Sequence, residues 1–289
     1  MTYLYLLLAI LSSATIAIDG RLYNDKHRHR PNVSGLYNLL YALFAALGWL
    51  LLWMGDFSFD LRVLPYSLLY GLGESCFAIG MLGALRTGST SLTALVQQVA
   101  LVFVSVWGFF FWDTKFTLLS TLGILLIILS LSLCLLTKEP DDTSHNTLRW
   151  SAFALLITVG NAGCSIVQRY QQTAFEYQHK NMFMFFGVFF AAITCFLLAR
   201  KEPRDNWSAA FKISWGFPCL AGFGTVLCNV FILLLIKYNM SPVIVYPGVA
   251  AGGLMFTILI SIACFREKLR FAQWCGLLIG AVALVLLNL

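Results

Sequence analysis

The chain alternates long apolar runs with short polar connections. A helix needs about 20 mainly apolar residues to cross the hydrocarbon core of a membrane, and ten runs reach or approach that length. Polarity does not alternate along these runs, as it does along the strands of a transmembrane barrel. The pattern therefore predicts ten transmembrane helices, over Thr2–Ile18, Val33–Met54, Val63–Leu85, Ser89–Trp112, Phe116–Thr137, Leu148–Tyr170, Met182–Ala199, Ile213–Ile236, Met240–Phe265 and Phe271–Leu289.

Basic residues in the connections predict the orientation. Connections that follow the odd-numbered runs hold fourteen of the 19 Lys and Arg residues, and the opposite side holds five, Arg62, Lys115, Arg169, Lys180 and Lys237. Cytoplasmic loops carry the excess of Lys and Arg, so both termini are expected outside the cytoplasm. The net charge of +6 then reflects topology, and no nucleic-acid partner is needed to explain it.

Composition agrees with a membrane protein. Hydrophobic residues make up 60% of the chain and charged residues 11%, with a mean hydropathy of +0.81, whereas soluble domains carry about 25% charged residues. The first run lacks a basic n-region and an A-x-A-like cleavage site, so we interpret it as a retained helix and not as a signal peptide. We expect an all-α, multi-pass protein of the cell (plasma or inner) membrane.

Residues for metal binding or catalysis are not grouped in the sequence. The eight cysteines form no CxxC pair, and the four histidines lie in connections without metal-ligand spacing. The chain has no H-E-x-x-H or G-x-S-x-G motif and no nucleotide-binding loop. We expect no metal, no cofactor and no enzymatic activity.

A polar stretch, residues 138–147, divides the ten runs into five and five. The two halves carry a weak internal likeness, in which a G-x-G triplet precedes a basic residue by thirteen positions: Gly71, Gly73 and Arg86 in the first half, and Gly222, Gly224 and Lys237 in the second. Because five is odd, the second half must enter the membrane inverted relative to the first. We therefore predict two inverted five-helix repeats, residues 1–137 and 148–289, with a solute site near the bilayer midplane where they meet.

Short patches resemble a known family. The stretch Ala84–Leu92 through Gly123 is similar to the third-to-fifth-helix pattern of ten-helix EamA-type members of the drug/metabolite transporter superfamily. Phe265–Leu269 followed by Gly276 is similar to the acidic turn before their last helix, although Asp113-Thr114-Lys115 departs from the pattern in the first half. The resemblance implies a transporter fold and leaves the solute open, because the family carries chemically diverse solutes.

Glu74 is the strongest candidate for a solute-binding residue. It lies about eleven residues from either end of Val63–Leu85, where an acid costs roughly 2.5–3.5 kcal/mol and such residues face a protein interior or a watery cavity. Tyr66, Tyr70 and Phe77 share its helix face, at spacings of four and three. Aromatic rings beside an anion hold organic ammonium groups. The alternative is a structural acid hydrogen-bonded to a neighbouring hydroxyl, with the tyrosines at the membrane interface.

A polar stripe follows the sixth predicted helix. Its members are spaced by three and four residues, so they share one face, and they are Thr158, Asn161, Ser165, Gln168 and Gln172. Such a stripe lines a solute pathway or hydrogen-bonds neighbouring helices, and the sequence leaves both readings open. Asn229, in the eighth predicted helix, is a weaker candidate of the same kind.

The function favoured by the sequence is secondary transport of a small organic solute by alternating access. We expect a cationic or amine-bearing solute, with protons as a coupling ion through Glu74. The alternative is an anionic or phosphorylated solute held by Arg86 and Lys237, which otherwise act as anchors at helix ends. A second alternative, of another class, is a membrane enzyme or a structural membrane protein. Expected partners are the solute, the lipid bilayer and protons, and a homodimer is compatible with the sequence.

Overall fold

The protein is described by a computed structural model, which covers residues 2–26, 34–87, 90–112, 117–135, 147–200, 208, 211, 215–265 and 271–287. Over these ranges the structure is α-helical, with a short 3-10 turn, η1 (Leu61–Val63), and no strand. The helices are α1 (Thr2–Lys26), α2 (Ser34–Gly55), α3 (Leu64–Thr87), α4 (Thr90–Phe111), α5 (Leu118–Leu135), α6 (Thr147–Ala174), α7 (Lys180–Ala199), α9 (Gly216–Lys237), α10 (Pro242–Phe265) and α11 (Phe271–Leu287).

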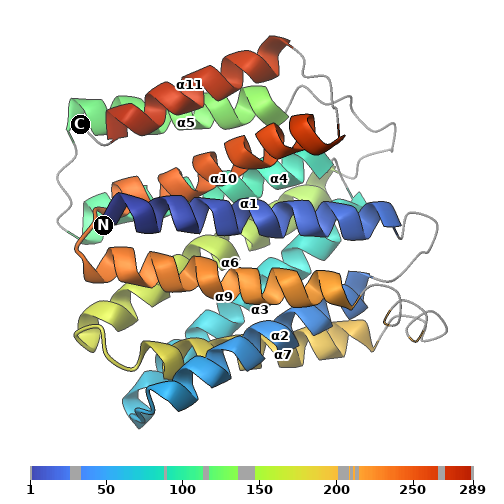
Figure 1. Cartoon of the computed structure of the whole chain (residues 1–289), viewed down its shortest axis with the longest axis vertical. Helices are drawn as coiled ribbons and strands as arrows, with labels where there is room; N and C mark the ends of the chain where they lie inside the picture. Colours follow the sequence, from blue (N-terminus) through green and yellow to red (C-terminus); the bar gives the residue numbers. More distant parts are fainter. Residues whose placement is uncertain are drawn as a thin grey trace.

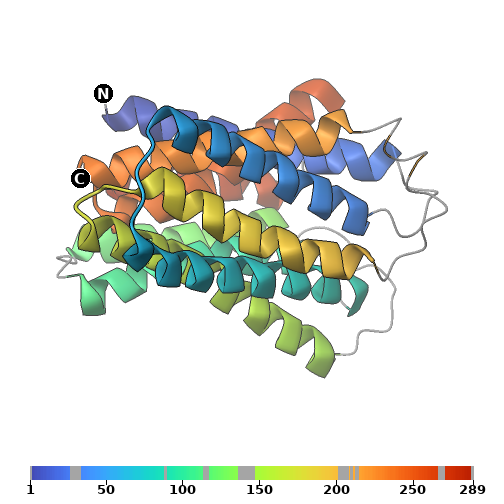
Figure 2. The same ribbon diagram turned by 90° about the horizontal axis from the view of Figure 1, so that it is seen from below.

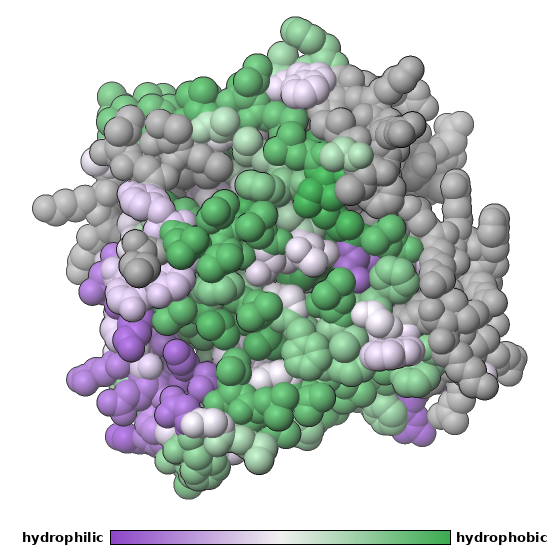
Figure 3. All heavy atoms as spheres, in the orientation of Figure 1, coloured by the Kyte–Doolittle hydropathy of each residue, from purple (hydrophilic) through white to green (hydrophobic). Residues whose placement is uncertain are grey.

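Each predicted span has a helix, so the predicted all-α class with ten helices is confirmed. Within the described residues, six helices (α1, α2, α3, α6, α7 and α9) are long and apolar enough to cross a membrane, and α5, α10 and α11 contain shorter apolar stretches. Apolar side chains cover much of the visible surface, while hydrophilic ones gather at one corner (Figure 3). The protein is therefore a multi-pass integral membrane protein.

One predicted boundary is wrong in a way that matters for function. The first span was expected to end at Ile18, with Asp19 in the following connection, but α1 continues to Lys26. Asp19 is consequently helical and only 2% exposed. The apolar run marks only the part of the helix that tolerates lipid. The helical backbone hydrogen bonds continue beyond it, and Asp19 is covered by other helices.

The helices pair mainly across the two halves of the chain. The most extensive contacts are α3 with α6, α5 with α11, α1 with α9, and α2 with α7, and Figures 1 and 2 show these helices side by side. The helices of the two halves correspond in chain order: α1 to α6, α2 to α7, α3 to α9, α4 to α10 and α5 to α11. If each helix is replaced by its counterpart, the α3–α6 contact becomes the α1–α9 contact, and the α3–α7 contact becomes the α2–α9 contact. This exchange also converts the α1–α10 contact into the α4–α6 contact.

Helix direction fits this exchange. The N- and C-termini lie at one end of the bundle, and α6 begins at the end opposite to the start of α1 (Figures 1 and 2). Equivalent helices of the two halves thus run in opposite directions with equivalent neighbours. This is the contact pattern that two inverted five-helix repeats produce.

Glycines bring α3 and α6 into close contact. A Cβ atom added at Gly160 of α6 would lie 2.5 Å from the backbone nitrogen of Phe77 and 2.6 Å from the carbonyl oxygen of Gly73, both on α3. About one turn away, a Cβ at Gly80 would lie 2.8 Å from the backbone nitrogen of Ile157. Small residues let transmembrane helices approach this closely. The α3–α6 seam therefore holds the middle of α3, including Glu74, against the second half of the chain.

Candidate functional site

Glu74 faces the interior of the bundle. On α3, Leu68, Leu72 and Ile79 are exposed and follow one another at helical spacing, so they form the outward face. Glu74 is two residues from Leu72, which rotates it about 200° around the helix axis, away from that face. The side chain is nevertheless half-buried rather than fully buried.

Groups from several helices surround this carboxyl. The Tyr70 hydroxyl and the Cys164 thiol lie near it, and Tyr41 and Cys195 lie within electrostatic range. These residues come from α3, α6, α2 and α7 respectively. Among the described residues, no basic side chain pairs with Glu74. The site is thus a carboxyl with hydroxyl and thiol neighbours contributed by both halves.

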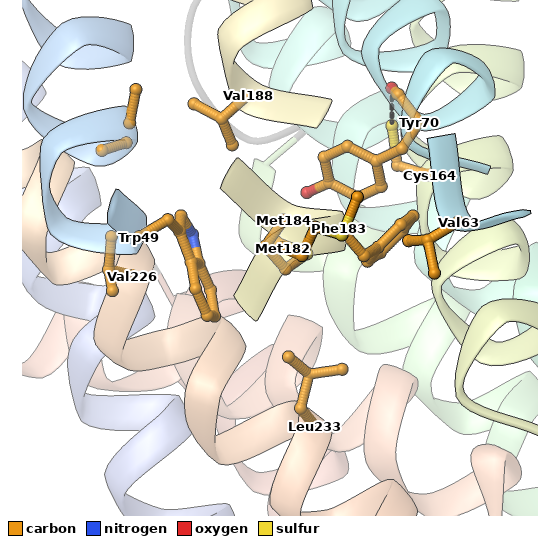
Figure 4. Packing of buried hydrophobic residues seen from close by; sticks show 12 residues of the cluster. Trp49, Val63, Tyr70, Cys164, Met182, Phe183, Met184, Val188, Val226 and Leu233 are labelled. Atoms are coloured by element: carbon orange, nitrogen blue, oxygen red, sulfur yellow. Dashed lines mark hydrogen bonds between the residues drawn. The ribbon is translucent and has the colours of Figure 1, made fainter. Parts of the chain in front are cut away.

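Tyr70 is held rigidly beside Glu74. Its side chain is 4% exposed, and its ring meets the Phe183 ring of α7 edge-on with centroids 5.3 Å apart. The Cys164 thiol donates to the Tyr70 carbonyl oxygen at 3.4 Å. Figure 4 shows Tyr70, Phe183 and Cys164 together in the core. A role of Tyr70 and Glu74 in holding a solute stays a prediction.

A string of polar side chains leads from Tyr41 to α6. The hydroxyl groups of Tyr41 and Thr225 are hydrogen-bonded at 2.8 Å, and the Asn229 amide donates to the Thr225 carbonyl oxygen at 3.0 Å. The Gln168 amide donates to the Asn229 side-chain oxygen at 3.2 Å. The structure thus brings together two predicted site residues, Gln168 and Asn229, and connects them to the Glu74 surroundings through Tyr41.

The rest of the α6 stripe is engaged by neighbouring helices. The Asn161 amide donates to the Gln97 carbonyl oxygen of α4 at 2.9 Å, and the Tyr246 hydroxyl of α10 donates to the Ser165 carbonyl oxygen at 3.2 Å. The Ser165 hydroxyl bonds back to the Asn161 carbonyl oxygen at 3.3 Å. Interhelical hydrogen bonding, one of the two roles left open for the stripe, is therefore present. Contact of these residues with a solute stays a prediction.

Other predicted residues lie farther away or in a different setting. Tyr66 is eight residues from Glu74, or about 12 Å along α3, and its ring meets the Phe175 ring edge-on at 5.7 Å. Phe77 is half-buried on the α3–α6 seam. Lys237 is exposed at the last residue of α9. Arg86 lies near the end of α3, and its side chain is outside the described part of the structure.

Sequence reasoning missed three members of this site. Tyr41, Thr225 and Cys164 were not selected, because a tyrosine, a threonine or a cysteine is common in an apolar helix and costs little there. A usable signal was the spacing of four between Tyr37 and Tyr41, which places two phenols on one face of α2. No group of three or more His, Cys, Asp or Glu side chains suited to a metal ion occurs among the described residues.

Comparisons with known proteins agree with this architecture. Residues 1–136 match the EamA-like transporter family, whereas no curated protein matches the chain. Among solved structures 28 chains match. One, a crystal structure of a protein, has 15% sequence identity and a TM-score of 0.71, and the alignment covers 100% of this chain and 98% of that one.

At 15% identity the structural likeness shows the fold alone. The family match concerns membrane transporters rather than enzymes, and such proteins contact the lipid bilayer and small solutes. It falls on the half of the chain that contains Glu74, Tyr70 and Tyr41. Residues 1–136 are therefore similar to the EamA-like transporter family, and the resemblance to the drug/metabolite transporter superfamily drawn from the sequence is confirmed.

Proposed function

We propose that the protein is a secondary transporter that moves a small organic cation by alternating access, with Glu74 as the carboxylate that binds it. The observation that carries this proposal is a half-buried carboxyl, in the middle of a bundle, that no described basic side chain neutralises. A charge at this depth is costly unless it is paired. A cationic solute supplies the missing partner.

The surroundings of Glu74 suit an amine or quaternary ammonium group. Two tyrosines, Tyr41 and Tyr70, lie within electrostatic range of the carboxyl, and cations are attracted to aromatic faces as well as to anions. The polar string beyond Tyr41, formed by Thr225, Asn229 and Gln168, offers hydrogen bonds to other polar groups of a solute. These contacts would fix the orientation of the solute while the carboxyl provides the charge.

Alternating access requires that both halves contribute to one site. In this proposal the repeats are residues 1–137 and 148–289, joined by the polar linker 138–147. The exchange pattern of the helix contacts supports this division. Because Tyr41, Tyr70 and Glu74 belong to the first repeat and Cys164, Gln168 and Asn229 to the second, a movement of one repeat against the other opens the site to one side at a time.

Coupling to protons follows from the use of a single carboxyl. Burial disfavours the charged form of a carboxyl, so in the absence of solute the group is expected to take up a proton. One carboxyl holds either one proton or one monovalent cation, and the two compete. Exchange is then one proton for one cation and moves no net charge across the membrane, so transport should depend on the pH gradient and not on the membrane potential.

Glu74→Gln tests the proposal, because it preserves shape and removes the charge. Purified protein in proteoliposomes is assayed for pH-driven uptake of a panel of amine and quaternary ammonium probes, with folding checked by size-exclusion chromatography and circular dichroism. We expect the variant to fold and to lose concentrative uptake. Glu176→Gln is the matched control, since Glu176 is an exposed carboxyl in the α6–α7 connection.

Transport by Glu74→Gln at the wild-type rate, with unchanged pH dependence, would mean that the acid is structural. Uptake of anionic probes by wild type, lost on substitution of Arg86 or Lys237, would instead support the anionic alternative.

A further inference from the structure

A groove between α1 and α9 forms a second pocket, separate from the surroundings of Glu74. Its volume is about 330 Å³, and it is lined mainly by apolar residues of the two helices, with Asp19 among them. Small-molecule sites are typically concave, mostly apolar and about 300–1,000 Å³ in volume, with a few polar groups that fix orientation. The groove meets this description at the lower end of the range.

Only one of the two carboxylate oxygens of Asp19 accepts a hydrogen bond from a described residue. The residue is 2% exposed, and its Oδ2 atom accepts a hydrogen bond from the Tyr37 hydroxyl of α2 at 3.1 Å. Its Oδ1 atom is buried without a hydrogen-bond partner among the described residues. A buried carboxylate oxygen without a partner is costly. The free oxygen therefore calls for a cation or a donor that the described part of the protein does not supply.

Aromatic rings surround the same carboxyl. The centroids of the Tyr37 and Tyr23 rings lie 4.5 Å apart. The Phe217 ring meets the Tyr23 ring edge-on, with centroids 6.3 Å apart. Phe217 itself lines the groove. A carboxylate beside aromatic rings is the combination that holds an organic ammonium group, through charge and cation–π attraction.

The helices packed around Asp19 contribute no opposite charge in the described region. From α2 the facing group is the Tyr37 phenol, and from α9 the groove receives Gly216, Phe217 and Leu220. On the outer rim, Leu22 and Leu220 are exposed, at 37% and 55%. As far as the described residues show, the groove is therefore apolar at its mouth and carries one acid at its base.

We propose that this groove binds an organic ammonium ion that carries an apolar group. The ammonium lies at the base of the groove, next to the Asp19 side chain, and the apolar part lies along Ile18, Leu22 and Leu220. Asp19 is seventeen residues from the start of α1, or about 25 Å along the helix axis, so the groove lies toward the end of the bundle opposite the termini. An amphipathic amine dissolved in the membrane would reach it without entering the centre.

The groove stands next to the proposed central site without sharing its residues. The Tyr37 ring stacks on the Tyr41 ring with centroids 6.5 Å apart, and Tyr41 is one of the residues around Glu74. The stacked rings of Tyr37 and Tyr41 thus lie between Asp19 in the groove and the central carboxyl of Glu74. Binding in it goes beyond the transport proposed above, and it does not depend on Glu74.

Binding stoichiometry tests the proposal. Purified full-length protein in detergent is equilibrated with radiolabelled benzyltrimethylammonium, whose charge does not change with pH. We expect two bound molecules per wild-type chain, and one in each of the variants Asp19→Asn and Glu74→Gln. Tetramethylammonium, which lacks the ring, should bind the Glu74→Gln variant about tenfold more weakly than the benzyl compound, because it buries less apolar surface.

A second variant guards against a folding defect in Asp19→Asn. Leu220→Trp fills the groove from its exposed rim without touching the carboxyl, and should also remove one site. Leu227→Trp is the matched control, since Leu227 is on the same helix and is 52% exposed, and it should keep both sites.

The outcomes separate this inference from the proposed function. If wild type binds no probe, or if Asp19→Asn and Leu220→Trp both keep the wild-type stoichiometry, the groove is not a cation site. If Glu74→Gln is the only one of these variants that keeps the wild-type stoichiometry, the probe does not bind at Glu74. The groove then remains supported as a binding site.

Discussion

Two carboxyls of this protein, at Glu74 and Asp60, lie in opposite electrostatic surroundings. Asp60, in the connection before α3, forms an ion pair with Arg62 at 2.7 Å. Hydrogen bonds from the Arg62 side chain and backbone lower the pKa of Asp60 to about 2. Asp60 therefore stays ionised throughout the neutral range, whereas Glu74 has no described basic partner. Asp60 is therefore not expected to contribute to a pH dependence of transport near neutrality.

Asp60→Asn should leave the pH profile of transport unchanged. Because its pKa is lowered in the folded state, the carboxylate contributes stability above its unfolded pKa, and this contribution is lost only as the pH falls toward about 2. The profile is measured in proteoliposomes beside wild type. A shifted midpoint in the variant would place a transport-linked proton at this exposed pair and weaken the role proposed for Glu74.

The hydrogen bond between Gln168 and Asn229 should contribute a small coupling energy. Such bonds between transmembrane helices average about 0.6 kcal/mol in double-mutant cycles. We expect a value of that order from Gln168→Leu, Asn229→Leu and the double variant, measured by unfolding in micelles. A coupling energy indistinguishable from zero would mean that the 3.2 Å contact does not stabilise the fold.

The sequence could identify Glu74 but could not identify its neighbours. An acid in the middle of an apolar run is conspicuous whatever the fold, because the run itself shows how deep in the membrane the acid lies. Tyr41 and Cys164 matter only because α2 and α6 turn those faces toward α3, and this rotation is set by packing. Asp19 was missed for a related reason, since a charged residue one position beyond an apolar run resembles the start of a connection.

At the level of helices, the α3–α6 seam determines how precisely Glu74 is placed. Glycines on both helices bring the backbones together, and Gly160 meets the backbone at Phe77, three residues from Glu74. Backbone atoms cannot move aside as a flexible side chain can. A methyl group at Gly160 must therefore separate the helices and displace the carboxyl.

Gly160→Ala should destabilise the protein by about 1–3 kcal/mol, as overpacking does, and should slow transport. Gly163→Ala is the matched control on the same helix, because a Cβ atom there meets nothing within 4 Å. It should be neutral or stabilise α6 by up to about 1 kcal/mol, the helix-propensity difference between glycine and alanine. Unfolding in micelles compares the two variants, and equal losses would show that the seam is not tightly packed.

Helix positions were predictable because apolar length alone specifies a span. Helix ends were less predictable, since α1 continues eight residues past Ile18 and α6 continues four residues past Tyr170. Several polar residues in these extensions are covered by other parts of the fold. Gln171 and Gln172 of α6, for example, are almost fully buried.

At the scale of the whole molecule, the ends of the bundle have predicted sides. The α6–α7 connection, which contains Gln178, lies at the same end as both termini (Figure 1). The distribution of basic residues predicts that this end is outside the cytoplasm. Gln178→Cys should react with a membrane-impermeant maleimide added outside intact cells, after subtraction of labelling in the parent chain. Thr143→Cys, in a segment outside the described residues, should react only from inside.

Labelling of Gln178→Cys and Thr143→Cys from the same side would contradict the ten-span topology. Labelling of each from the side opposite to its prediction would reverse the orientation and leave the fold unchanged. The pairing of helices between halves was not predictable from the chain, because hydrophobic runs specify which segments cross the membrane and not which segments become neighbours.

The pairing of helices across the halves has a consequence during synthesis. The most extensive partners of α1, α2, α3 and α5 all lie in the second half, so the ribosome delivers these helices to the membrane before their partners exist. Until α6 arrives, the seam face of α3 and its carboxyl have no permanent neighbours. We expect a chain ending at residue 137 to be degraded when made alone and to persist when residues 148–289 are made in the same cell, as measured by immunoblotting. Survival of the lone segment at full abundance would contradict this expectation. The interval before α6 emerges from the ribosome is therefore the period in which quality-control proteases can act on the nascent protein.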